Sequence, residues 1–77
     1  MDTKVYDKIE NNLKQLFKYR KNPLNIRQTL DIYYKKFGDN DWPEHIKVIA
    51  LNLVSEGYLK LDTMWRLERV RKTKKST

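Results

Sequence analysis

Residues 51–70, LNLVSEGYLKLDTMWRLERV, change from a helical to a strand-like pattern of apolar residues. Up to Gly57 the apolar residues recur at helical spacing, whereas residues 58–61 and 64–70 alternate apolar and polar side chains with period two. Residues 62–63 form a short polar connection between these two runs. The pattern predicts a helix that stops at a glycine, followed directly by a β-hairpin. An isolated hairpin is marginal in water, so one of its faces should pack on helices through Leu59, Leu61, Trp65 and Leu67.

Two further helices are expected toward the N-terminus. Asp2 and Thr3 are both candidates to cap the first helix, which should fade near residues 19–21 because the residue before a proline disfavours helical geometry. The second helix should begin at Asn25, where Gln28 three residues later completes a capping-box pattern. Gly38 is placed to end that helix in the left-handed conformation.

The third helix has the clearest start signal in the chain. Asp41 is the expected N-cap, Pro43 stands in the first turn, and Glu44 would close a capping box. The predicted fold is therefore mainly α with a small β-hairpin: three helices and a C-terminal wing. We expect one domain over residues 1–71 and a basic tail over residues 72–77 that is disordered when nothing is bound.

Composition narrows the function classes. The 77 residues allow a single modest core, and the absence of cysteine together with a lone histidine argues against thiolate and histidine-built metal sites. The sequence contains no nucleophile motif and no phosphate-cradling glycine loop. No apolar run approaches the ~18 residues that span a bilayer. We therefore expect a cytoplasmic, non-enzymatic protein without a cofactor, a metal or a membrane segment.

The net charge of +7 is unevenly distributed along the chain. Residues 1–38 contain nine Lys/Arg and four Asp/Glu, giving +5, and residues 58–77 contain seven and two, also giving +5. Residues 39–57 contain one lysine and four acids, giving −3. A small basic protein commonly binds a polyanion, because its cations release the counterions of phosphates. The alternative is a solvated surface that only keeps the protein soluble.

The order of elements resembles the winged helix-turn-helix family. The residues that carry the resemblance are Leu51, Leu53, Val54, Glu56, Gly57, Tyr58 and Leu59, followed by Trp65, Arg66 and Leu67. The resemblance implies that residues 41–56 correspond to the recognition helix. It also implies that the hairpin is a wing able to lie along a nucleic-acid backbone or in a minor groove.

The start of the third helix departs from that family's usual chemistry. A helix that enters a major groove usually offers basic or amide side chains at its N-terminal end. Here that end carries Asp39, Asp41 and Glu44, which a duplex would repel. Conventional sequence reading by this helix is therefore not expected, and the basic surfaces lie on the first two helices and on the wing with its tail.

The candidate nucleic-acid contacts are mostly cations of the wing and tail. They are Lys60, Arg66, Arg69, Arg71, Lys72, Lys74 and Lys75, with Lys47, Asn52 and Arg27 from the helices. Two aromatic residues, Trp65 and Trp42, could stack on unpaired bases. A tryptophan in the wing more often closes the core beneath the hairpin, and that interpretation of Trp65 is favoured.

Two functions remain open on the sequence alone. The first is a DNA-binding regulator or replication accessory, with DNA favoured over RNA, and with weakly specific or single-stranded binding as open as operator binding. The second is an accessory subunit or inhibitor that docks on a larger replication or nucleic-acid enzyme. Its interface would be Asp39, Asp41, Trp42 and Glu44. The lysine- and asparagine-rich composition is typical of products of phages, plasmids or other mobile elements. A monomer and a homodimer fit both functions.

Overall fold

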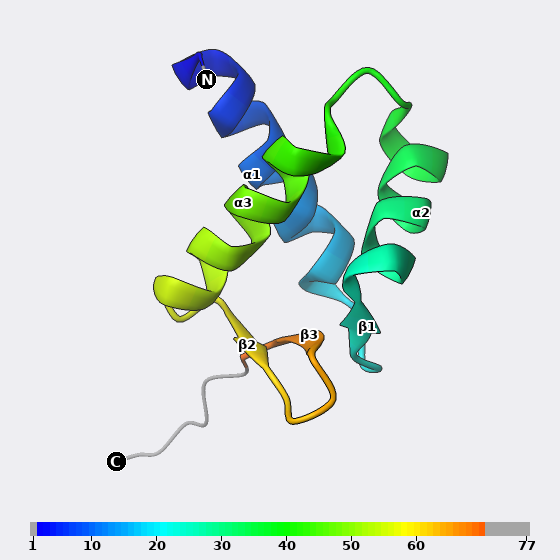
Figure 1. The fold of residues 1–77 in the computed structure, drawn as a ribbon, viewed down its shortest axis with the longest axis vertical. Coiled ribbons are helices and arrows are strands. Elements are labelled where there is room, and N and C mark those ends of the chain that lie inside the picture. The colour runs from blue at the N-terminus through cyan, green and yellow to red at the C-terminus, as the bar shows by residue number, and fades with distance from the viewer. Residues whose placement is uncertain (1, 71–77) are drawn as a thin grey trace.

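The computed structural model describes residues 2–70 as three α-helices and a small antiparallel sheet of three strands (Figure 1). The elements, in chain order, are α1 Thr3–Lys18, β1 Leu24–Asn25, α2 Ile26–Phe37, α3 Pro43–Ser55, β2 Leu59–Leu61 and β3 Arg66–Arg69. The mainly helical architecture with a hairpin after the third helix is confirmed. Within the described residues, no helix combines the length and the apolar character that crossing a bilayer would need.

Local signals place the first two helices where the sequence predicts them. The Asp2 carboxylate accepts a hydrogen bond from the Lys4 backbone N–H at 2.9 Å, which caps α1. The Asn25–Gln28 capping box of α2 is formed in both directions, at 2.7 and 3.0 Å. Gly38 follows α2 with the expected positive φ of 92°, but its ψ of 174° is extended rather than left-handed helical.

The predicted capping box at the start of α3 is wrong. The N-cap is Trp42, which makes no side-chain capping hydrogen bond, and Pro43 is the first helical residue. The Asp41 carboxylate is occupied elsewhere, because it accepts the Tyr33 hydroxyl at 2.7 Å and lies 2.9 Å from the Lys8 ammonium. A tertiary contact has replaced the local one, and Asp41 stands one residue outside the cap position.

The sheet is larger than the predicted hairpin. Its order is β1-β3-β2, so β3 is central and pairs with both neighbours. Leu67 of β3 lies opposite Leu61 of β2 and opposite Leu24 of β1. Strand β1 was not predicted, because two residues are too few to show a period. Through β1, the hairpin is tied to the connection between α1 and α2.

The turn of the hairpin is also longer than predicted. The Asp62 carboxylate accepts the backbone N–H groups of Met64 and Arg66 at 2.8 and 2.9 Å, so β3 begins only at Arg66. Trp65 therefore lies in the turn, with a positive φ of 60° and 75% of its surface exposed. The interpretation that Trp65 closes the core is wrong, because the turn removes it from the alternation of the strand.

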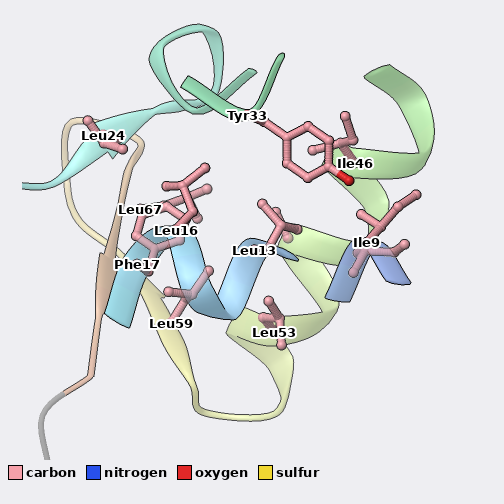
Figure 2. Packing of buried hydrophobic residues seen from close by; sticks show 12 residues of the cluster. Ile9, Leu13, Leu16, Phe17, Leu24, Tyr33, Ile46, Leu53, Leu59 and Leu67 are labelled. Carbon is pink, nitrogen blue, oxygen red and sulfur yellow. The ribbon is translucent and has the colours of Figure 1, made fainter. Parts of the chain in front are cut away.

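The core surrounds the buried face of α1. Leu13 lies near the centre of the cluster in Figure 2, among side chains from the other two helices and the sheet. The buried apolar residues are Ile9, Leu13, Leu16, Phe17, Leu24, Tyr33, Ile46, Ile49, Ala50, Leu53, Leu59 and Leu67. Because each of the three strands contributes one buried leucine, Leu24, Leu59 and Leu67, the sheet belongs to the same core as α1, α2 and α3.

A polar network crosses the end of the core where α2 connects to α3. The Tyr33 ring is fully buried, and its hydroxyl accepts the Asn12 amide at 3.1 Å while donating to Asp41. Burial raises the pKa of the Tyr33 hydroxyl further above its ordinary value. Since Lys8 and Asn12 belong to α1, the network fixes the 38–42 connection against the first helix.

Replacing Trp65 by glycine should stabilise the fold. A non-glycine residue at positive φ costs about 1–2 kcal/mol, and the extra chain entropy of glycine offsets about 0.5–1 kcal/mol of the gain. Removal of the indole sacrifices little buried surface, because Trp65 is largely exposed. We expect the free energy of unfolding of Trp65→Gly to rise by about 0.5–1 kcal/mol in urea titrations. A loss above about 1 kcal/mol would show that the indole contributes to packing.

The Asp41 network should make stability depend on acid pH. Burial by itself raises the pKa of Asp41, but the hydrogen bonds from Tyr33 and Lys8 outweigh it, so the pKa lies below its usual value. The stabilisation is then complete above the unfolded-state pKa of about 3.9 and is lost as the pH falls through the lowered folded-state pKa. Asp41→Asn should therefore be less stable than the native chain at pH 6, and the difference should shrink toward pH 2. A difference that is constant over this range in urea titrations would contradict the assignment.

Candidate nucleic-acid interface

Two cations from distant parts of the chain, Lys14 of α1 and Arg69 of β3, meet at the Tyr58 ring. The Lys14 ammonium lies 5.4 Å and the Arg69 guanidinium carbon 5.2 Å from the ring centroid. The Tyr58 hydroxyl donates to the Lys14 carbonyl oxygen at 3.2 Å, which holds the ring against α1. An open groove at this place is lined by Lys14, Lys18, Glu56, Gly57, Tyr58, Arg69 and Val70, and we call it the Tyr58 groove.

The turn after α3 puts Tyr58 in this position. Gly57 adopts a φ of 87°, and the Tyr58 backbone N–H donates to the Leu53 carbonyl at 2.9 Å. This is the hydrogen bonding expected where a glycine ends a helix, and it turns the chain into β2. Figure 1 shows the sheet at the end of the molecule where α1 and α3 both finish. The glycine stop that the sequence predicts therefore also orients the aromatic ring of the groove.

Arg69 contributes to the groove from strand β3. Its Nη1 donates to the Lys18 carbonyl oxygen at 2.8 Å, at the C-terminal end of α1. A cation is favourable there because the last carbonyls of a helix carry partial negative charge. Among residues 2–70, no carboxylate forms an ion pair with Lys14, Lys18 or Arg69. The positive charge of the groove is therefore available to an anion.

The positive surface continues beyond the groove. Arg69 also borders a second hollow with Arg20, Lys21 and Lys60. Arg20 and Lys21 in turn border a third hollow with Lys36. We call the set the basic strip: Lys14, Lys18, Arg20, Lys21, Lys36, Lys60 and Arg69. Two carboxylates line the same hollows, Glu56 and Glu68, and Glu68 is paired with Lys60 at 3.2 Å. Cations thus outnumber carboxylates by seven to two.

The residues predicted as contacts from the sequence are placed unequally. Lys60 and Arg69 lie in the basic strip, whereas Arg66 is held by Asp62 within the hairpin turn at 2.9 Å. Arg27 and Lys47 are exposed on α2 and α3 and do not line these hollows. The Asn52 amide donates to the Tyr6 hydroxyl at 3.0 Å and so joins α3 to α1. The remaining predicted contacts, Arg71, Lys72, Lys74 and Lys75, lie outside the described residues.

The sequence places a basic surface on the first two helices, but no residue of α1 is among the contacts predicted from it. Lys14 and Lys18 are four residues apart and therefore share one face of the helix, which the sequence does show. Their meeting with Arg69, which is more than fifty positions away, depends on the packing of β3 across the end of α1. No local pattern contains that information.

The solvent face of α3 has a different character. Val48 and Leu51 are each 51% exposed, and Trp42 just before the helix is 66% exposed. Of the acids predicted to form a protein interface, Asp39 and Glu44 are exposed, while Asp41 is engaged by Tyr33 and Lys8. The α3 face is therefore partly apolar, with acids at one end and Lys47 as an exposed cation, and it differs in character from the basic strip.

Comparison of the chain with protein-family models, with curated proteins and with solved structures found no match. The functional evidence is therefore the arrangement of the cations on the fold. Seven of them line connected hollows over α1, the segment after it, β2 and β3, with Lys36 of α2 at the edge. The geometry suits contact with a chain of phosphates, which arginine and lysine side chains bind without reading bases.

Proposed function

We propose that this chain is a non-enzymatic, winged-helix-type protein that binds DNA through the basic strip. The observation that carries the proposal is the convergence of Lys14, Lys18 and Arg69 around Tyr58 with no carboxylate paired to them among residues 2–70. The winged-helix assignment is supported by the 38–42 connection between α2 and α3 and by the hairpin that directly follows α3.

Weak sequence specificity follows from where the cations lie. Direct reading of a duplex needs polar side chains that reach base edges in a groove. The exposed face of α3 presents the apolar residues Val48 and Leu51 and the cation Lys47. The Asn52 amide is already hydrogen-bonded to Tyr6. The basic strip offers ammonium and guanidinium groups, whose contacts with phosphates fix position without specifying sequence. A regulator or replication accessory of low specificity fits these features.

We include the basic C-terminal residues in the proposed interface because they directly follow a residue that lines the groove. Val70 lines the Tyr58 groove, and the next residues in the sequence include Arg71, Lys72, Lys74 and Lys75. We propose that these cations, which follow Val70 in the sequence, add phosphate contacts to the DNA bound in the groove. Each added contact steepens the loss of affinity with salt, because it releases a further counterion.

A second candidate function is supported by the α3 face. Val48, Leu51 and Trp42 expose apolar surface beside the Asp39 and Glu44 carboxylates. A partner with complementary apolar and basic side chains, such as a larger replication or nucleic-acid enzyme, would cover that surface. In that case the chain acts as an accessory subunit or inhibitor. Co-purification with proteins encoded nearby should then be lost in the double variant Val48→Glu and Leu51→Glu, and retention of the partner would reject the docking face.

Replacing two cations of the groove should weaken DNA binding broadly. We expect the double variant Lys14→Ala and Lys18→Ala to lose affinity for oligonucleotides of unrelated sequence at low salt. The slope of log affinity against log salt should fall by about 1.4–1.8, which corresponds to two phosphate contacts. Fluorescence anisotropy in a salt series measures both quantities.

The matched control is the double variant Lys35→Ala and Lys47→Ala. It removes the same charge from exposed positions outside the strip and should leave the slope nearly unchanged. Equal effects of the two variants would show that only net charge matters. Failure of the native chain to bind single- and double-stranded oligonucleotides at low salt would reject the proposed function altogether.

A further inference from the structure

Tyr19 is the most exposed large hydrophobic residue of the described chain. It is the C-cap of α1, and 82% of its surface is accessible. The ring borders a hollow with Arg20, Lys21 and Lys36, and the Lys18 ammonium lies 5.4 Å from its centroid. An aromatic ring is therefore displayed to solvent inside the basic strip.

The other tyrosines have structural partners that explain their positions. The hydroxyls of Tyr6, Tyr33, Tyr34 and Tyr58 each form a hydrogen bond with another residue of the fold. Among the described residues, the Tyr19 hydroxyl makes no such bond, and the ring takes no part in the core. Neither packing nor hydrogen bonding within residues 2–70 accounts for an aromatic side chain at this position.

The remaining exposed aromatic side chains lie in a different electrostatic setting. Trp42 borders a hollow with Asp39 and Asp41, where a phosphate would be repelled. Trp65 lies in the hairpin turn, where the neighbouring Arg66 is already paired with Asp62. Tyr19 is thus the exposed aromatic of the described chain that borders a hollow with several cations and no carboxylate.

An aromatic ring among cations suits an unpaired base. Proteins that bind single strands combine a positive groove along the backbone with aromatic side chains on which bases stack. Within a duplex both faces of each base are covered by neighbouring bases, so a protruding tyrosine finds no face to stack on. The ring and the cations of this hollow can therefore be used together only by an unpaired segment.

We propose that the basic strip binds single-stranded DNA, with Tyr19 stacking on one base while Arg20, Lys21 and Lys36 contact neighbouring phosphates. This inference rests on the proposed DNA-binding function and specifies its substrate class. The strand then runs from Lys36 past Tyr19 toward Arg69 and the Tyr58 groove, along hollows that share lining residues.

The test compares three labelled ligands by fluorescence anisotropy at fixed low salt. They are a single-stranded oligonucleotide of mixed sequence, the same strand in a duplex, and an oligonucleotide of equal length made of abasic sites. Tyr19→Ala should weaken binding of the single strand by about 5- to 150-fold, the range associated with loss of one stacked base. Its affinities for the duplex and for the abasic strand should remain within about twofold of native.

Two further variants make the result specific. Tyr19→Phe keeps the ring and should bind the single strand like the native chain. Trp42→Ala removes another exposed aromatic side chain, which lies outside the strip, and should also bind like the native chain. Unchanged thermal unfolding of all three variants shows that the fold is retained, as expected for exposed positions.

Each failure has a distinct meaning. If Tyr19→Ala leaves single-strand binding unchanged, or weakens the duplex and abasic ligands equally, stacking is rejected while the Lys14 and Lys18 result still decides the proposed function. If the native chain binds the duplex more tightly than the single strand, the substrate class is wrong. If it binds none of the ligands, the proposed function itself fails, and this inference fails with it.

Discussion

The attachment of β3 to the end of α1 is the contact on which the surface depends. Arg69 donates to the Lys18 carbonyl, and Tyr58 donates to the Lys14 carbonyl, so the C-terminal hairpin is bonded to the last turns of the first helix. Leu59 and Leu67 bury their side chains in the same core as α1. Through this attachment, Lys14 and Lys18 of α1 share a surface with Arg69 of β3.

A second constraint decides what α3 presents to solvent. Because Tyr33 and Lys8 hold the Asp41 carboxylate, the helix begins at Pro43 with Trp42 as an uncapped and exposed N-cap. The core uses Ile46, Ile49, Ala50 and Leu53, yet Val48 and Leu51 remain half exposed on the other side. A helix that is apolar on both sides suits burial against a further surface better than entry into a charged groove. This property separates the α3 face from the basic strip.

Much of the fold could be predicted because its signals are local. The capping box at Asn25, the proline at position 43 and the glycine at position 57 act within a few residues, and each ends or begins a helix as expected. The errors arose where a distant partner intervened. Asp41 bonds to α1 and α2 instead of its own helix, and β1 exists because β3 lies beside it. Trp65 shows a third cause, since the Asp62 carboxylate extends the turn and moves the indole out of the strand.

The sequence by itself determined the helices, the hairpin, the excess of cations at both ends and the acids at the start of the third helix. Each of these depends on residue type and on spacing over fewer than about twenty residues. Tertiary packing was needed to bring Lys14 and Arg69 to the Tyr58 ring, to place Lys18 in the same groove, and to leave Tyr19 exposed among cations. The physical reason is that a charged or aromatic surface is defined by distances in space. Those distances follow from how leucines of the helices and the sheet share a single core.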